Sequence, residues 1–170
     1  MQTERTYWTT LSETDLPAMM EMAREPDTFK YLKKFRDMSE ETYFRYCQDK
    51  LEQIRTGRGY HWAIWLKREP RFVGAVNLNP VPDTDMMQIG CQLKRAFWKQ
   101  GFASELTARV LTFAVRELKL PRVYGVFEKE NAASRRLLEK LGFTYEQSLR
   151  RIDVELEIHR YGPPIEKPQP

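Results

Sequence analysis

The order of the expected secondary-structure elements is the feature that most limits the folds open to this chain. Three consecutive stretches have the composition and spacing of strands, and short turns or loops join them, which is typical of antiparallel neighbours. They are Tyr60–Lys67, Phe72–Asn79 and Met86–Leu93. After them come a helix, a strand, a second helix and two more strands, and this alternation adds a parallel crossover. The order predicts a mixed α/β fold with a mostly antiparallel sheet of about seven strands and flanking helices.

The remaining elements follow from strand-forming residues, helical apolar stripes and capping residues. The other expected strands are Arg5–Thr10, Arg122–Phe127, Phe143–Leu149 and Val154–Tyr161. The expected helices run from Thr14 or Asp15 to about Arg24, from Ser39 to Gly57, from Phe102 to Leu118 and from Asn131 to Gly142.

Length and composition indicate a single domain. The chain has 170 residues, 41% of them hydrophobic and 31% charged, which is ordinary for a globular protein with its own core. We assign residues 1–161 to this domain. Prolines crowd residues 162–170 without any apolar period, so we expect this tail to be extended or disordered.

Charge, cysteine content and hydropathy exclude several other classes of protein. The net charge of +4 comes from interspersed basic residues, so no nucleic-acid-binding surface is expected. Cys47 and Cys91 are too few for a disulfide scaffold or a cysteine zinc site, and they are expected to be buried thiols. We find no signal peptide and no apolar run of about 18 residues, so a cytoplasmic protein without a membrane partner is expected.

The segment Lys99-Gln100-Gly101-Phe102-Ala103-Ser104-Glu105 joins a strand to a helix and is typical of an anion site. Glycine lets the backbone approach a ligand closely. The first N–H groups of the following helix have no partner within the helix, and the helix dipole favours negative charge there. The segment therefore predicts a phosphate-binding loop.

A second block, Asn131-Ala132-Ala133-Ser134-Arg135-Arg136-Leu137-Leu138-Glu139-Lys140-Leu141-Gly142-Phe143, lies downstream. With both blocks placed on this order of elements, residues 5–161 resemble the GNAT acetyltransferase superfamily, specifically its RimJ/RimL-like branch. Trp98-Lys99-Gln100-Gly101-Phe102-Ala103 fills the superfamily pattern Gln/Arg-x-x-Gly-x-Gly/Ala. Trp98 departs from it at the first position. Lys99 stands where glycine is frequent, so one amide of the loop is expected in a different place.

The resemblance implies acetyl-CoA as the donor, a primary amine as the acceptor, and no metal. It implies that the amides of Gln100, Gly101, Phe102, Ala103 and Ser104 hold the pyrophosphate. The strand end around Leu93 would pair with the pantetheine arm. Asn131 and Ser134 would lie beside the pantetheine and the thioester sulfur.

Nearby basic side chains are candidates for contact with the phosphates of coenzyme A, although a solvated helix face is the alternative for at least two of them. They are Lys94, Arg95, Lys99, Arg135 and Arg136.

Acetyl transfer from a thioester needs a neutral amine, donors for the carbonyl oxygen and a proton for the leaving thiolate. We expect Ser134 to supply that proton, and its alternative role is in the helix N-terminus. Glu128 is a candidate catalytic base at the end of a strand.

The residues leave the identity of the base open. Relatives often carry glutamate near Gln88, and an amide cannot accept the proton. Asp83, Asp85 and His61 are the other candidates.

Function is expected to be direct N-acetylation of a protein N-terminus or a small-molecule amine, by a monomer or a homodimer. The alternative is an acyl-CoA-binding or sensing domain that keeps the phosphate loop but lacks the chemistry. Gln88, in place of an acid, keeps that alternative open.

Overall fold

The computed structural model describes residues 1–81, 84–151 and 153–163. Its strands are β1 (Thr6–Thr10), β2 (Tyr60–Leu66), β3 (Phe72–Pro80), β4 (Met87–Leu93), β5 (Val123–Glu128), β6 (Thr144–Arg151) and β7 (Val154–Tyr161). Its helices are α1 (Leu16–Arg24), α2 (Lys33–Arg36), α3 (Glu40–Arg55), α4 (Phe102–Thr112) and α5 (Ala132–Lys140). The 3₁₀ turns η1 (Glu13–Asp15) and η2 (Arg95–Phe97) and a π-helical turn η3 (Phe113–Glu117) complete them.

The strands form one seven-stranded sheet in the order β1-β2-β3-β4-β5-β7-β6. Neighbouring strands are antiparallel throughout, except for the parallel pair β4 and β5. The predicted mixed, mostly antiparallel sheet with one parallel crossover is therefore confirmed. The crossover places α4 between the two parallel strands in the chain.

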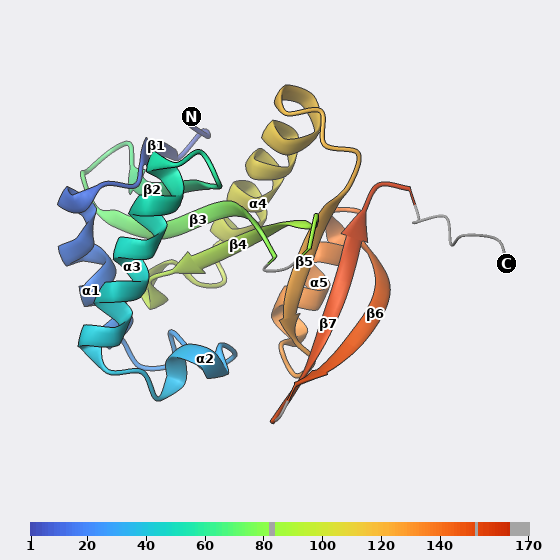
Figure 1. The fold of residues 1–170 in the computed structure, drawn as a ribbon. Coiled ribbons are helices and arrows are strands. Elements are labelled where there is room, and N and C mark those ends of the chain that lie inside the picture. The colour runs from blue at the N-terminus through green and yellow to red at the C-terminus, as the bar shows by residue number, and fades with distance from the viewer. Residues whose placement is uncertain (82–83, 152, 164–170) are drawn as a thin grey trace, which may run out of the picture.

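Helices cover both faces of the sheet, with α1 and α3 on one face and α4 and α5 on the other (Figure 1). Side chains alternate along β4, so Ile89 and Leu93 join the core beneath α4. Gln88, Gly90 and Gln92 consequently face the side that carries α1 and α3. A second core, which includes Tyr43 and Cys47 of α3, packs against that side.

Capping residues lie at the predicted ends of α3 and α5. The Ser39 hydroxyl accepts a hydrogen bond from the Thr42 N–H (3.2 Å) at the start of α3. Asn131 caps α5, and Gly142 follows that helix with φ +86°. Both ends of α5 are thus confirmed.

Two helical features differ from the expectation. No sequence pattern indicated α2, which is a single turn. The helix expected to reach Leu118 ends at Thr112 and continues as the π-helical turn, in which the Leu118 N–H donates to the Phe113 carbonyl (3.1 Å). In this wider turn Phe113 packs edge-on against Trp62, with ring centroids 5.4 Å apart.

Some expectations concern residues outside the described ranges. Asp83 and residues 164–170 of the proline-rich tail lie there. In the described part of the chain, every helix is too short or too polar to cross a membrane.

Candidate functional site

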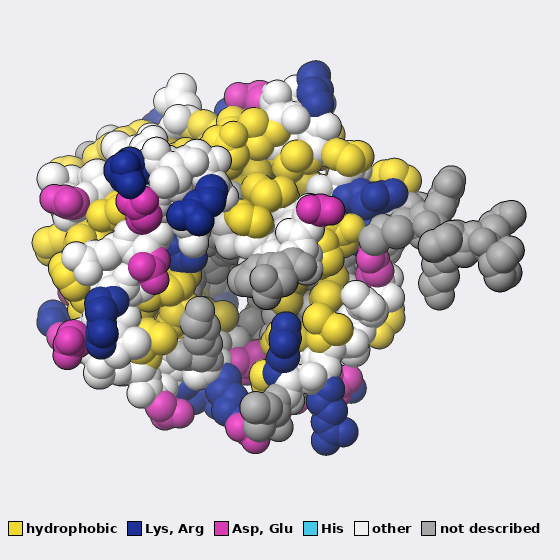
Figure 2. All heavy atoms as spheres, in the orientation of Figure 1, with side chains coloured by type: hydrophobic (Ala, Val, Ile, Leu, Met, Phe, Trp, Pro, Cys, Tyr) yellow, Lys and Arg dark blue, Asp and Glu magenta, His cyan; other side chains and the backbone are white. Residues whose placement is uncertain are grey.

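Strands β4 and β5 are hydrogen-bonded at one end and separate toward the other. Among the described residues their register contains a single pair, Gln88 with Tyr124, near the start of both strands. Figure 1 shows the two strands diverging from that point. In Figure 2 the surface is hollowed between the side that carries α1 and α3 and the side formed by β6 and β7. The parallel pair therefore opens a gap in the middle of the sheet.

The main chain of β4 points hydrogen-bond donors into this gap. The Lys94 N–H donates to the Val73 carbonyl of β3 (2.9 Å). Because N–H directions alternate along a strand, the N–H groups of Cys91 and Leu93 point away from β3 and toward the gap. The Leu93 carbonyl accepts a hydrogen bond from the Trp98 indole (2.8 Å). Leu93 thus presents an amide donor at the position where the sequence analysis expects pairing with a ligand.

The loop before α4 is shaped by two residues with positive φ. Lys99 has φ +57° and Gly101, the N-cap of α4, has φ +82°. The first helical hydrogen bond of α4 runs from the Glu105 N–H to the Gly101 carbonyl (3.1 Å). The N–H groups of residues 102–104 therefore have no partner within the helix, and Gly101 has no side chain to cap them. This geometry favours an anion at the helix start.

Arg5 lies against the same loop, which the sequence analysis did not anticipate. Its Nη1 donates to the Gln100 carbonyl (2.9 Å), and its Nη2 lies 2.6 Å from Glu105 Oε2. The guanidinium also lies over the Phe102 ring, 3.7 Å from the centroid. Arg5 holds the loop in place and offsets the negative charge of Glu105 beside it. The nearest of these partners is 95 residues away in the sequence, so no local pattern could have indicated the contact.

Helix α5 begins at the end of β5, on the same face of the sheet as α4 (Figure 1). The Asn131 N–H donates to the Glu128 carbonyl (2.8 Å). The Asn131 Oδ1 accepts from the Ser134 N–H (3.0 Å), so its capping role is established. In the described part of the chain the Ser134 hydroxyl has no hydrogen-bond partner, which leaves it able to donate to a ligand. Helix α5 thus follows β5 through residues 129–131, whereas α4 follows β4 through residues 94–101, which include η2.

Of the five basic residues predicted to meet phosphates, three are paired with acidic side chains, and Arg136 is exposed on α5. The pairs are Lys94 with Glu21 (2.6 Å), Arg95 with Asp27 (3.4 Å) and Arg135 with Glu157 (2.7 Å). Lys99 is exposed in the loop. An anion at the start of α4 would therefore be bound chiefly by main-chain amides.

The Glu128 carboxylate lies at the end of β5, on the face opposite α5. It is buried and accepts a hydrogen bond from the Lys33 N–H of α2. Arg36 Nη2 lies 3.2 Å from its second oxygen. Glu128 thus joins α2 to the edge of the gap, and its role as a base stays a prediction.

The other candidate bases are less well situated. His61 is buried, and its Nε2 lies 3.1 Å from Gln53 Oε1. Burial, with a smaller contribution from the charge of Lys50, lowers the pKa of His61 to about 4. His61 is therefore neutral at pH 7 and a weak proton acceptor. Asp85 is exposed to solvent.

Neither cysteine is a nucleophile at neutral pH. Burial raises the pKa of Cys91 to about 12 and that of Cys47 to about 11. Both thiols stay protonated, as expected for cysteines packed beneath helices. Among the described residues, no group of three or more side chains could hold a metal ion.

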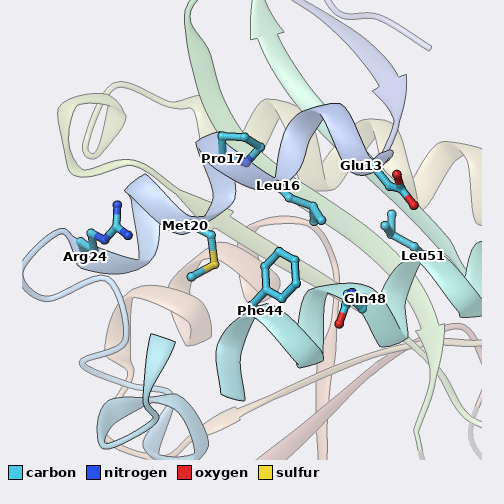
Figure 3. A pocket seen from close by; sticks show the side chains of 8 residues that line it. All are labelled: Glu13, Leu16, Pro17, Met20, Arg24, Phe44, Gln48 and Leu51. Atoms are coloured by element: carbon cyan, nitrogen blue, oxygen red, sulfur yellow. The ribbon is translucent and has the colours of Figure 1, made fainter. Parts of the chain in front are cut away.

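A groove of about 650 Å³ lies elsewhere, between α1 and α3. Figure 3 shows Phe44 and Met20 facing each other across it. Its lining residues are Glu13, Leu16, Pro17, Met20, Arg24, Phe44, Gln48 and Leu51. None of them belongs to β4, β5, α4 or α5, so this groove is separate from the candidate site.

Comparison with known proteins connects this geometry to a family. The sequence profile described as "Acetyltransferase (GNAT) domain" matches residues 5–144. A Bacillus licheniformis protein named uncharacterized N-acetyltransferase p20 is 26% identical over 157 residues, which cover 88% of this chain and 85% of that protein.

Solved structures share the fold. RimL, a ribosomal L7/L12 alpha-N-protein acetyltransferase in complex with coenzyme A, has a TM-score of 0.80 at 17% identity, covering 95% of this chain and 96% of its own. Spermidine N-acetyltransferase from Vibrio cholerae, in complex with CoA and spermine, has a TM-score of 0.77 at 16% identity, covering 94% and 96%. These two proteins act on different amines, so the structural similarity establishes the fold and does not identify the acceptor.

The buried His61 gives a testable pH dependence. Its pKa of about 4 in the folded state lies below the ordinary value of 6.5, so the unfolded chain binds more protons between these values. Stability is therefore lost as pH falls through this window, by about 2 kcal/mol between pH 7 and pH 5. Urea unfolding at both pH values measures this loss of stability. The variant His61→Gln is expected to abolish the part of the loss that comes from His61. An NMR titration of His61 with a midpoint near 6.5 would contradict it.

Proposed function

The chain belongs to the GNAT family of acetyltransferases, and we propose that it transfers the acetyl group of acetyl-CoA directly to a primary amine. One observation carries the proposal: the gap between β4 and β5 lies beside the uncapped start of α4. The gap can receive an extended chain, and the helix start can bind a diphosphate. Together they suit a long ligand that has a phosphate group in its middle and a reactive end.

Main-chain donors are proposed to bind acetyl-CoA. The amides of residues 100–104 suit the pyrophosphate, since residues 102–104 lack helical partners. The end of β4 around Leu93 suits the pantetheine arm, as a neighbouring strand would pair with it. Lys94 and Arg95 already hold acidic partners, so Lys99 is the basic side chain best placed to assist.

The proposed reaction forms one bond and breaks another. The amine nitrogen attacks the thioester carbonyl carbon, the carbon–sulfur bond breaks, the amine loses a proton and the thiolate gains one. The carbonyl oxygen gains negative charge on the way, and a fixed N–H donor stabilises that charge. We assign this role to the Leu93 N–H. Positioning both reactants in the gap supplies a large part of the rate.

Ser134 is proposed to protonate the leaving thiolate. Its hydroxyl is half-buried, in the first turn of α5, and is not used by any neighbouring described residue. Asn131 holds the Ser134 N–H, so the residue stays in the helical conformation while its hydroxyl faces the ligand.

Glu128 is proposed to accept the amine proton. It lies on the face of the sheet opposite α4 and α5, from which the amine would approach. The low pKa of His61 and the exposure of Asp85 make those two residues poorer candidates. Because Arg36 is paired with the Glu128 carboxylate, this role requires that Arg36 give way to the amine.

The acceptor is a primary amine of a protein N-terminus or a small molecule. Incubation with acetyl-CoA and a panel of peptide and small amines, with free thiol measured, tests the proposal. We expect thiol release with at least one amine, well above hydrolysis without an amine. The second candidate function, an acyl-CoA sensor, is favoured by Gln88 in place of an acid. It requires tight binding of acetyl-CoA and no release with any amine.

Replacing Gly101 by valine should weaken acetyl-CoA binding. A β-branched residue is strained at φ +82°, so the loop shifts and at least one amide loses its phosphate. One hydrogen bond to a charged group is worth about 1.5–3 kcal/mol, so calorimetry should record a loss of roughly tenfold to a hundredfold. Gly57→Val is the matched control, because Gly57 has φ +66° far from the site. Unchanged affinity in Gly101→Val would place the phosphate elsewhere.

Replacing Ser134 by alanine should lower turnover far more than donor binding. Loss of a general acid typically costs about a hundredfold or more in rate. We expect kcat to fall by about that factor, while the Kd for acetyl-CoA changes by less than roughly threefold, since the hydroxyl is proposed to act only on the leaving sulfur. Ser148→Ala on β6 serves as the control. Parallel losses in kcat and binding, or no loss in either, would remove the assigned role.

A further inference from the structure

Arg135 is only partly buried, yet its guanidinium binds β7. Its Nε donates to Glu157 Oε2 (2.9 Å) and its Nη2 to Glu157 Oε1 (2.7 Å), which is the two-pronged geometry of a strong arginine–carboxylate pair. Its Nη2 also donates to the Lys129 carbonyl (2.8 Å) in the connection between β5 and α5. One side chain therefore links the first turn of α5 to both the sheet and the loop that precedes the helix.

The carboxylate of Glu157 also contacts His159, through the same oxygen that Arg135 Nε binds. His159 Nε2 lies 3.1 Å from Glu157 Oε2, and the His159 side chain is 2% exposed. The His159 ring in turn packs against the Phe127 ring, with centroids 5.0 Å apart. The pair with Arg135 and the contact with His159 lower the pKa of Glu157, so it stays ionised at neutral pH. These contacts hold the two carboxylate oxygens of Glu157 in the orientation that binds Arg135.

A second contact fixes α5 one turn farther along. Leu138 packs directly on Gly125 of β5, where a Cβ atom would lie 2.3 Å from Leu138 Cδ1. This contact sets how closely the helix approaches the strand. This contact does not by itself fix the rotation of the helix about its own axis, because an apolar side chain on a glycine provides no directional bond.

Helical geometry places Ser134 and Arg135 on either side of the Leu138 line. At about 100° per residue, Ser134 lies roughly 40° from Leu138 around the axis and Arg135 roughly 60° on the other side. Any roll of α5 about the Leu138 contact therefore moves the Ser134 hydroxyl by the same angle as the Arg135 side chain. The pair with Glu157 is the directional contact that opposes such a roll.

We infer that Arg135 and Glu157 are positioning residues that fix the rotation of α5 and so aim the Ser134 hydroxyl at the reacting sulfur. The inference rests on the proposed function of Ser134. It also gives Arg135 a role other than the predicted contact with coenzyme A phosphates, because its Nε and Nη2 donors bind Glu157 and the Lys129 carbonyl. A partly buried ion pair contributes little net stability, which suits a role in position.

Steady-state kinetics of Glu157→Gln and Arg135→Lys test the inference. Each variant approximately keeps the size of the side chain and weakens the two-pronged pair between Arg135 and Glu157. We expect kcat to fall by roughly tenfold to a hundredfold, as small misplacement of a reacting group does. The Kd for acetyl-CoA should stay within about threefold of the parent. In a Ser134→Ala background, Glu157→Gln should change kcat by less than about twofold, because residues that act through one another are not additive.

Hydrogen exchange gives a readout that does not need turnover. The Ser134 amide donates to Asn131 Oδ1, so its exchange rate reports on the first turn of α5. We expect this amide to exchange about tenfold faster in Glu157→Gln. Glu52→Gln is the matched control, since it removes the same charge from an exposed two-pronged pair with Arg55 on α3 and should leave kcat and exchange unchanged. Arg135→Lys supplies the same measurement if Glu157→Gln does not fold.

Three results would overturn the inference. Unchanged kcat and unchanged exchange in both variants would make the pair incidental. A tenfold weaker Kd for acetyl-CoA with unchanged kcat would make Arg135 a phosphate ligand. A full loss of kcat that persists in the Ser134→Ala background would separate the pair from Ser134. If the parent protein released no thiol with any amine, the proposed function would fail, and the exchange rates alone would then decide whether the pair holds α5.

Discussion

The parallel pair of β4 and β5 is the constraint on which the rest of the site depends. The crossover between these two strands places α4 on one face of the sheet, and the strands remain paired only at Gln88 and Tyr124 in the described chain. Beyond that point the Leu93 N–H is left facing an open gap, and both strands lead into helices on the same face. The gap and the two helix starts beside it therefore lie where β4 and β5 stop pairing. That arrangement gives a ligand main-chain donors on two sides.

The electrostatics of the site come mainly from the backbone. Basic side chains surround the start of α4, but Lys94 and Arg95 are paired with acids of α1 and the segment after it, and Arg5 is paired with Glu105. Amides of the first helical turn carry the positive potential that remains. Such donors cannot move away or change protonation, so a bound diphosphate would meet a rigid site. The mild net charge of +4 agrees with a site of this kind.

The opposite face of the sheet has another character. Gln88 and the neutral His61 lie on this face, and the Glu128 carboxylate is bound to α2 through Lys33 and Arg36. An amine entering from this side would meet a carboxylate that is already paired with Arg36. The short helix α2, which no sequence pattern indicated, is thereby linked to the end of β5. Acceptor access and proton removal are expected to be coupled through that contact.

The local sequence determined the secondary-structure elements of this protein and the residues that cap its helices. Ser39 and Asn131 begin helices and Gly142 ends one where the sequence predicts, and Gly101 forms the expected turn. These features could be predicted because capping and positive φ depend on a few adjacent residues. Tertiary structure alone decided which charged groups are available. Arg135 looked like a phosphate ligand by position, yet it binds Glu157, 22 residues away in the sequence. Such partnerships depend on strand register and helix rotation, which are settled only when the whole sheet and its helices pack together.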